Sequence, residues 1–158
     1  MKKIRPYGLE MTEHCAEISW RLGDGNFGLD YDRTHIWRFD GGVEVPASSA
    51  PHMRGDPSRV DPEEAFVASI SSCHMMWFLH HAAAAGLGVT SYTDRAVGIM
   101  RRDQDGTTWI PEVTLHPVIE WIDGSTPQPE VVRALHDDSH RRCFIANSVR
   151  TAVTIADL

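Results

Sequence analysis

Long apolar runs, basic clusters and cysteines are scarce in this sequence. No run of about 18 apolar residues is present, so we expect no membrane-spanning helix and no membrane partner. Lys and Arg total 15 against 22 Asp and Glu, and the resulting net charge of −7 disfavours a nucleic-acid partner. The stretch MKKIRPYGLEMTEHC has neither an apolar core nor a small-residue cleavage site, so we do not expect a signal peptide.

Three cysteines, Cys15, Cys73 and Cys143, are too few and odd in number for the disulfide framework of a secreted protein. We therefore expect a cytoplasmic protein, in whose reducing surroundings a disulfide is more often catalytic than structural. The composition, 42% apolar and 23% charged, is that of an ordinary globular chain. The 158 residues suffice for one buried core and no linker divides them, so we predict a single domain over 1–158.

The first third of the chain predicts a small antiparallel sheet. In residues 14–22 every second residue is apolar, which is typical of a half-buried strand. A second strand is expected at 33–39, and the D-G-G turn that follows predicts a tight hairpin into a third strand at 43–45, closed by Pro46.

A long helix is predicted next. Asp61 is a suitable N-cap, Pro62 suits the first helical position, Glu64 completes a capping box, and Gly86 supplies a stop. The segment between them is apolar nearly all round, which indicates a buried central helix. The aperiodic stretch 46–60 before it is a long loop, a kind of segment that is often functional.

The last part of the chain predicts strands and one shorter helix. Strands are expected at 89–100, 108–121 and 148–155, and the helix at 129–142. In the second of these strands Val113, Leu115, Ile119 and Trp121 share a face. This order of elements predicts an α+β fold with a mainly antiparallel sheet.

Cys73 lies in the middle of the long helix, where a cysteine is often only a small buried apolar residue. Neighbouring serines and histidines make its surroundings more polar than a plain core helix. Cys73 and His80 are seven residues apart, as are His74 and His81, and about 10.5 Å along a helix is too far to share one ion. We therefore expect no metal, and we expect these histidines at the helix surface or in an interface.

Cys143 follows the second helix and has Arg141 and Arg142 beside it. These cations could favour the thiolate, or they could simply complement the negative end of the helix dipole. Cys15 falls on the polar face of the first strand, which indicates an exposed thiol without a role.

The pattern D-P-E-E-x-F-x-A-S-x-S-S-C-H, followed about 70 residues later by the second helix-end cysteine, resembles the OsmC/Ohr family. These are the osmotically inducible protein C and organic hydroperoxide resistance proteins. The resemblance extends over nearly the whole chain and includes the ten-residue spacing from Glu63 to Cys73. It implies an OsmC-like fold, in which a mainly antiparallel sheet packs around a long central helix, and an intertwined homodimer with active sites at the subunit interface.

The resemblance also implies a thiol-dependent peroxidase acting on organic hydroperoxides, without a metal or bound cofactor. Cys73 matches the peroxidatic cysteine and Cys143 the resolving cysteine, with the disulfide between them re-reduced by a dihydrolipoyl protein or a small thiol. Glu63 matches the active-site glutamate that orients a catalytic arginine. Relatives with Cys-Pro at the second cysteine differ from this chain, which has Phe144 there.

The catalytic arginine has three candidates in this sequence: Arg33, Arg38 and Arg54. Arg33 has the same parity as the bulky aromatic residues of the second strand, whereas Arg38 has the opposite parity. We therefore favour Arg33, with Arg54 second. Its guanidinium would stabilise the Cys73 thiolate and donate a hydrogen bond to the peroxide.

Glu63 and Cys73 cannot meet on one straight helix, because they would lie about 15 Å apart on faces that differ by roughly 80°. A catalytic Glu63 thus requires a break in the helix or a second subunit. An apolar substrate pocket could come from Phe66, Met75, Met76, Trp77 and Phe78, which could equally be core residues.

Two other functions fit the sequence. One is Cys–His acyl transfer from Cys73 with a remote base such as His35 or His140, which gives Cys143 no role. The other is a non-catalytic small-molecule-binding or redox-sensing protein that shares the fold.

Overall fold

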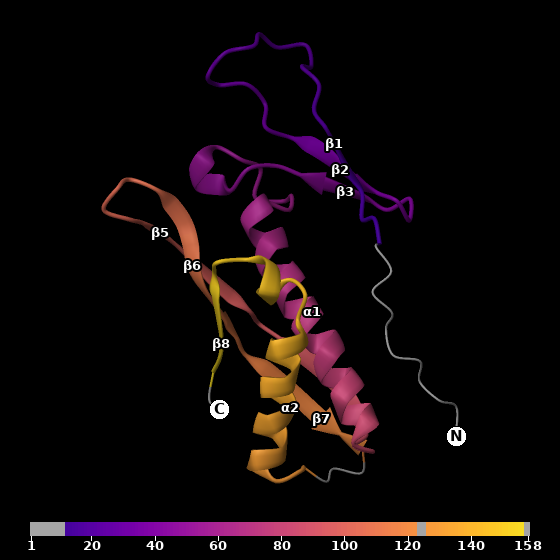
Figure 1. Cartoon of the computed structure of the whole chain (residues 1–158). Coiled ribbons are helices and arrows are strands. Elements are labelled where there is room, and N and C mark those ends of the chain that lie inside the picture. Colours follow the sequence, from indigo (N-terminus) through magenta and orange to yellow (C-terminus); the bar gives the residue numbers. More distant parts are fainter. Residues whose placement is uncertain (1–11, 123–125, 157–158) are drawn as a thin grey trace. The chain divides into compact units, whose positions relative to one another are not determined.

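The computed structural model describes residues 12–122 and 126–156, and it divides into two compact units, Met1–Pro62 and Glu63–Leu158 (Figure 1). Both helices longer than a single turn begin at a proline, α1 at Pro62 and α2 at Pro129. Proline suits the first helical position because its missing N–H would have had no partner there.

The first unit holds a three-stranded antiparallel sheet. Its strands are β1 (Ala16–Ser19), β2 (His35–Phe39) and β3 (Glu44–Ala47), in the order β1-β2-β3. The predicted D-G-G hairpin is confirmed, since Gly42 has a φ of 80° and its N–H donates to the Phe39 carbonyl over 2.8 Å. Pro46 lies inside β3, not after it, because β3 is an edge strand of the sheet, where a proline is tolerated.

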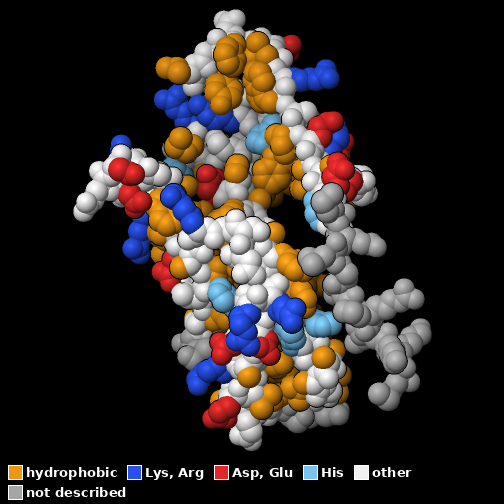
Figure 2. Space-filling view, in the orientation of Figure 1, with side chains coloured by type: hydrophobic (Ala, Val, Ile, Leu, Met, Phe, Trp, Pro, Cys, Tyr) orange, Lys and Arg blue, Asp and Glu red, His pale blue; other side chains and the backbone are white. Residues whose placement is uncertain are grey.

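The prediction of a half-buried first strand is wrong for the described chain. Ile18 is 59% exposed and Trp20 38% exposed. Three short strands are too small a sheet to bury a face without another layer, and the one-turn helix η1 (Pro51–Met53) adds no buried residue. The apolar side chains instead cluster with one another: the Trp20, Phe27 and Tyr31 rings lie 5.7–5.9 Å apart. Figure 2 shows hydrophobic side chains gathered over the segment between β1 and β2.

The predicted loop 46–60 is tied back to the sheet. Val60 bridges Ala47 in parallel, and its N–H donates to the Pro46 carbonyl over 3.2 Å. Ser48 is almost fully buried and accepts a hydrogen bond from the Asp56 N–H over 3.1 Å. These contacts give a segment without periodicity a defined path.

The second unit is built on α1 (Pro62–Ala84). The predicted stop is confirmed: Gly86 has a φ of 74°, and the N–H of Leu87 donates to the Ala82 carbonyl over 2.9 Å. The prediction of a helix buried all round is wrong for the described chain. Only one row is fully buried, and Met76 is 61% exposed. The buried row consists of Ile70, His74, Phe78 and Ala82, spaced four residues apart.

Four strands follow where two were predicted. They are β4 (Val89–Asp94), β5 (Val97–Arg102), β6 (Thr108–Leu115) and β7 (Pro117–Trp121). The break lies at Asp94, whose carboxylate accepts the His116 N–H over 2.6 Å and also the Ser71 hydroxyl of α1. A side chain thus replaces the backbone ladder at this point, and the long hairpin divides into two sheets.

β4 pairs with β7, whereas β5 and β6 form a sheet with β8 (Ala152–Ile155). β8 is shorter than predicted and runs parallel to β6, while the other pairs are antiparallel. The mainly antiparallel α+β fold is thus confirmed. The predicted inward face is confirmed as well, because Val113, Leu115 and Trp121 are buried and Ile119 packs against the core.

α2 (Pro129–Arg142) agrees with the predicted second helix and is followed by the short helix η3 (Ala146–Ser148). Two buried clusters form the core on either side of the middle of α1. One contains Phe78, Ala82, Trp121 and Leu135, and the other contains Ile70, Val113 and Leu115. No helix in the described part of the chain has the length and apolar character needed to cross a membrane.

Candidate active site

α1 and α2 run antiparallel and side by side (Figure 1), and their contacts follow in order along both helices. Leu135 of α2 packs with Ala82 of α1 in the first core cluster. The ring of His136 lies 4.5 Å from that of Phe78. This order brings the end of α2, where Cys143 lies, to the middle of α1.

Cys73 and Cys143 meet at this point, close enough for the two thiols to interact directly. Both are free thiols, with Cys73 half-buried and Cys143 completely buried. Cys143 is the residue at which the backbone leaves α2, and its N–H still bonds the Ser139 carbonyl over 2.8 Å. Two cysteines that are distant in sequence are therefore paired in space, on two separate helices.

Burial raises the pKa of the Cys143 thiol to about 11. The neighbouring Cys73 thiol raises the pKa further, while the Ala146 N–H, which donates to Cys143 Sγ over 3.3 Å, lowers it. Of the two readings of the adjacent arginines, the one in which they favour the thiolate is not supported at Cys143, because burial is the largest influence on its pKa and acts against the thiolate. Arg141 instead pairs with Asp138 on the helix surface. Cys143 is thus held as a protonated thiol at neutral pH.

Cys15 is exposed, as predicted, and its thiol donates to the carboxylate of Glu13 over 3.3 Å. It lies in the first unit.

A buried histidine pair lies beside the thiols and was missed by the sequence reasoning. His74 Nε2 lies 3.0 Å from His136 Nδ1, and the two rings are stacked with 11° between their planes. The prediction that His74 lies at the helix surface or in an interface is therefore wrong: it is 1% exposed. The sequence did contain a signal for this burial. His74 lies four residues after Ile70 and four before Phe78, so it shares a helix face with these apolar residues.

Burial lowers the pKa of both His74 and His136 to about 4. The other histidines near His74, His136 itself and His140, lower its pKa further, whereas Asp137 and Asp94 act in the opposite direction on His136. Both rings are therefore neutral at pH 7.

This pair predicts acid destabilisation. An unfolded histidine titrates near pH 6.5, so the unfolded chain binds more protons than the folded chain as the pH falls from 6.5 towards 4. We expect the free energy of unfolding to drop over that interval by about 3 kcal/mol for each histidine, or roughly 6 kcal/mol for the pair. Urea unfolding at pH 7.5, 5.5 and 4.5, at one protein concentration, measures the drop.

The doubly substituted variant H74Q/H136N is the control, because its amides can keep a hydrogen bond but cannot titrate. It should show a smaller acid loss than the wild type, the remainder coming from carboxylates. Equal acid losses in both proteins would contradict the assignment.

Aromatic side chains flank the thiols. Trp77, one turn after Cys73, makes an edge-to-face contact with Phe144, the neighbour of Cys143, at 5.6 Å between ring centres. Phe144 is 64% exposed. Of the predicted pocket residues, Phe78 is a fully buried core residue and Phe66 packs on the second core cluster, so neither is available to line a pocket.

Glu63 lies in the first turn of α1, and α1 continues without a break to Ala84. Glu63 and Cys73 are therefore about 15 Å apart within one chain, as expected for ten residues of straight helix. A catalytic contact between them within one subunit is excluded by this length.

The three candidate arginines all belong to the first unit, where each has a partner. Arg33 donates to the carbonyls of Tyr31 and Leu29 over 2.7 and 3.0 Å, and its guanidinium lies 4.5 Å from the centre of the Tyr31 ring. Arg38 pairs with Glu17 and Glu44 on the exposed face, in agreement with its predicted outward parity. Arg54 pairs with Asp30 and has a φ of 67°. The role of Arg33 stays a prediction.

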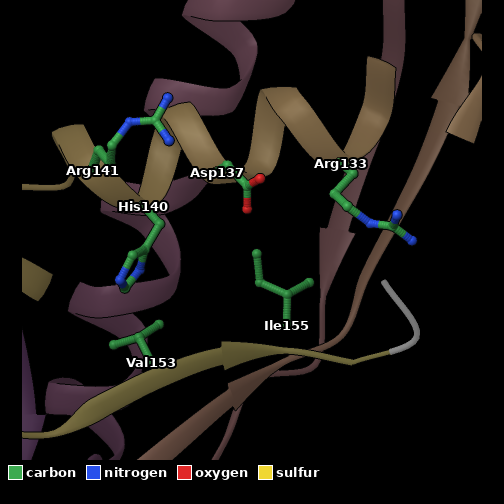
Figure 3. A pocket seen from close by; sticks show the side chains of 6 residues that line it. All are labelled: Arg133, Asp137, His140, Arg141, Val153 and Ile155. Atoms are coloured by element: carbon green, nitrogen blue, oxygen red, sulfur yellow. The ribbon is translucent and has the colours of Figure 1, made fainter. Parts of the chain in front are cut away.

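A cleft of about 350 Å³ lies between α2 and β8, apart from the thiols (Figure 3). Asp137 points into it from the helix and Ile155 from the strand (Figure 3). Arg133, His140, Arg141 and Val153 complete its lining. Within residues 12–122 and 126–156, no group of three or more His, Cys, Asp or Glu side chains is arranged to hold a metal ion.

The structure thus defines a class of thiol protein: a mainly antiparallel α+β fold with two paired thiols. Comparison with known families identifies this class. The family model of OsmC-like proteins matches residues 55–156. The chain therefore belongs to the OsmC-like family. A comparison with curated proteins finds no match.

Solved structures agree with this assignment. An OsmC-like protein of unknown function from Vibrio cholerae is 42% identical, with a TM-score of 0.87 over 92% of this chain and 98% of its own. An organic hydroperoxide resistance protein from Elizabethkingia anophelis is 19% identical, with a TM-score of 0.70 over 93% and 94%. A putative organic hydroperoxide resistance protein from Vibrio cholerae, with captopril bound in one of its active sites, is 19% identical, with a TM-score of 0.71 over 97% of each chain. The last two likenesses concern the fold alone.

Proposed function

We propose that this protein is a thiol-dependent peroxidase that reduces organic hydroperoxides. The observation that carries the proposal is the pairing of a half-buried Cys73 with a fully buried Cys143 in an OsmC-like fold. The fold is shared with proteins named for organic hydroperoxide resistance, which favours this substrate class.

In the first step the Cys73 thiolate attacks the terminal oxygen of the hydroperoxide. An S–O bond forms as the O–O bond breaks, so Cys73 becomes a sulfenic acid and the peroxide leaves as an alcohol after taking up a proton. In the second step the Cys143 thiol condenses with that sulfenic acid, giving a disulfide and one water. An external dithiol then reduces the disulfide by thiol–disulfide exchange and is itself oxidised.

The high pKa of Cys143 suits a resolving thiol. A protonated thiol is a poor nucleophile, so Cys143 does not compete with Cys73 for the peroxide. It does, however, lie against Cys73, where proximity compensates for low nucleophilicity in an intramolecular reaction.

We infer a homodimer in which Glu63 of one subunit acts at Cys73 of the other. The unbroken α1 supports this, because it holds Glu63 and Cys73 of one chain too far apart to meet. Glu63 would orient Arg33, whose guanidinium stabilises the Cys73 thiolate and donates a hydrogen bond to the peroxide.

Acyl transfer is less well supported by the site. Of its two candidate bases, His35 already accepts a hydrogen bond from the Trp37 indole over 2.8 Å within the first unit, and His140 lines the cleft between α2 and β8.

One equivalent of cumene hydroperoxide, added to the reduced protein, tests the proposed function. We expect the intact mass to fall by about two hydrogens and peptide mapping to find a Cys73–Cys143 link. No reaction, or oxidation of Cys73 alone to a sulfinic acid, would contradict the two-cysteine mechanism.

A further inference from the structure

A polar pair occupies the interior between the two helices that carry the thiols. His74 directly follows Cys73 on α1, and His136 shares the buried face of α2 with Ser139 and Cys143. The hydrogen bond between the rings spans 3.0 Å, and each histidine is 1% exposed. The two helices are thus joined directly by side chains next to the thiol pair.

This pair is a costly way to fill the space. His74 Nδ1 is buried and has no hydrogen-bond partner among the described residues, and an unsatisfied buried polar atom costs on the order of 1–3 kcal/mol. Two apolar side chains would fill the same volume without that cost. What the pair adds over apolar packing is direction, since a hydrogen bond is made at one distance and one orientation of the rings.

Direction matters here because apolar packing between the helices does not supply it. Leu135 packs into an apolar cluster, which tolerates small slides and rotations of the helix. Moving α2 by one residue would shift Cys143 by about 1.5 Å and turn it by roughly 100° about the helix axis. A thiol displaced in this way no longer faces Cys73.

We propose that the His74–His136 hydrogen bond is a positioning element for the thiol pair: it fixes the register and rotation of α2 on α1 at which Cys143 meets Cys73. Both histidines act through the helices that they join. Neither touches the peroxide. The proposal rests on the proposed function only in assigning Cys73 and Cys143 as a disulfide-forming pair.

The equilibrium between the reduced and the disulfide form of the protein tests this proposal. Reduced protein is equilibrated with mixtures of oxidised and reduced dithiothreitol, in which the protein gains a Cys73–Cys143 disulfide as the reagent is reduced. We expect His136→Leu to lower the equilibrium constant by about tenfold or more, because the thiols lose their mutual orientation. His136→Asn places an amide near the former Nδ1 position and should stay within about threefold of the wild type.

Ser139→Ala is the matched control on the same buried face, because the Ser139 hydroxyl donates only within its own helix, to the Leu135 carbonyl over 2.6 Å. It should leave the equilibrium unchanged. The double variant H74L/H136L removes both polar rings and keeps the site apolar. It should remain folded by circular dichroism and still show the tenfold loss.

Three outcomes would overturn the proposal: an unchanged equilibrium in both leucine variants, a loss in Ser139→Ala equal to that in His136→Leu, or no Cys73–Cys143 disulfide in the wild type. The readout needs no peroxide. A wild type that forms the disulfide but does not consume hydroperoxide would therefore refute the proposed function alone, while the variants still decide the positioning role.

Discussion

Cys143→Ser is expected to consume about one equivalent of cumene hydroperoxide and then stop, with Cys73 left as a sulfenic acid. The reason is that the only thiol held against Cys73 in the described chain is that of Cys143. Without it, the first step still runs but no disulfide follows. Dimedone labelling, read by mass spectrometry, detects the trapped sulfenic acid at Cys73.

Cys73→Ser should lower peroxide consumption by at least about a thousandfold, since it removes the nucleophile itself. Cys15→Ser is the matched control, because it removes an exposed thiol and should turn over normally with a dithiol reductant. Sustained turnover by Cys143→Ser, at the rate of the wild type, would mean that Cys143 does not resolve the sulfenic acid.

The second large effect concerns Glu63 and the dimer. Glu63→Ala and Cys73→Ser should each be inactive, and a one-to-one mixture of the two, co-expressed so that subunits combine, should regain activity. If each site takes Cys73 from one chain and Glu63 from the other, half of the dimers are mixed and each holds one complete site. Activity should then reach about a quarter of the wild-type value per chain.

A complementary mixture sharpens the test. Wild type co-expressed with the double variant C73S/E63A should give about a quarter of the wild-type activity if Glu63 acts across the interface, and about half if it acts within its own chain. Native mass spectrometry verifies that mixed dimers are present. Mixed dimers without recovery in the first mixture would show that the two residues do not cooperate between subunits.

Local signals explain which elements could be predicted from the sequence. Pro62 and Gly86 bound α1 because each has a conformational preference that acts on its own neighbours, and the D-G-G turn specifies its hairpin in the same way. The pairing of Cys73 with Cys143 was expected only through resemblance to a family. No local rule joins residues so far apart in sequence.

The features that were missed depend on distant partners. The division of the hairpin at Asp94 requires the hydroxyl of Ser71 and the N–H of His116, each more than 20 residues away. The burial of His74 requires His136, 62 residues along the chain. Sequence periodicity predicts that a polar side chain is exposed unless its buried partner is known. Periodicity alone therefore could not predict either feature.

The parallel pairing of β8 with β6 has a consequence for how the molecule acquires its second thiol. Glu112 stands opposite Ala152, so the pairing must close about 40 residues of chain, and α2 lies inside that closure. Such long-range contacts form late in folding, after local elements such as α1 and the β5–β6 hairpin. We therefore expect Cys73 to be in place on its helix before Cys143 is anchored, so that an oxidant reaching the chain at that stage would meet a lone thiol.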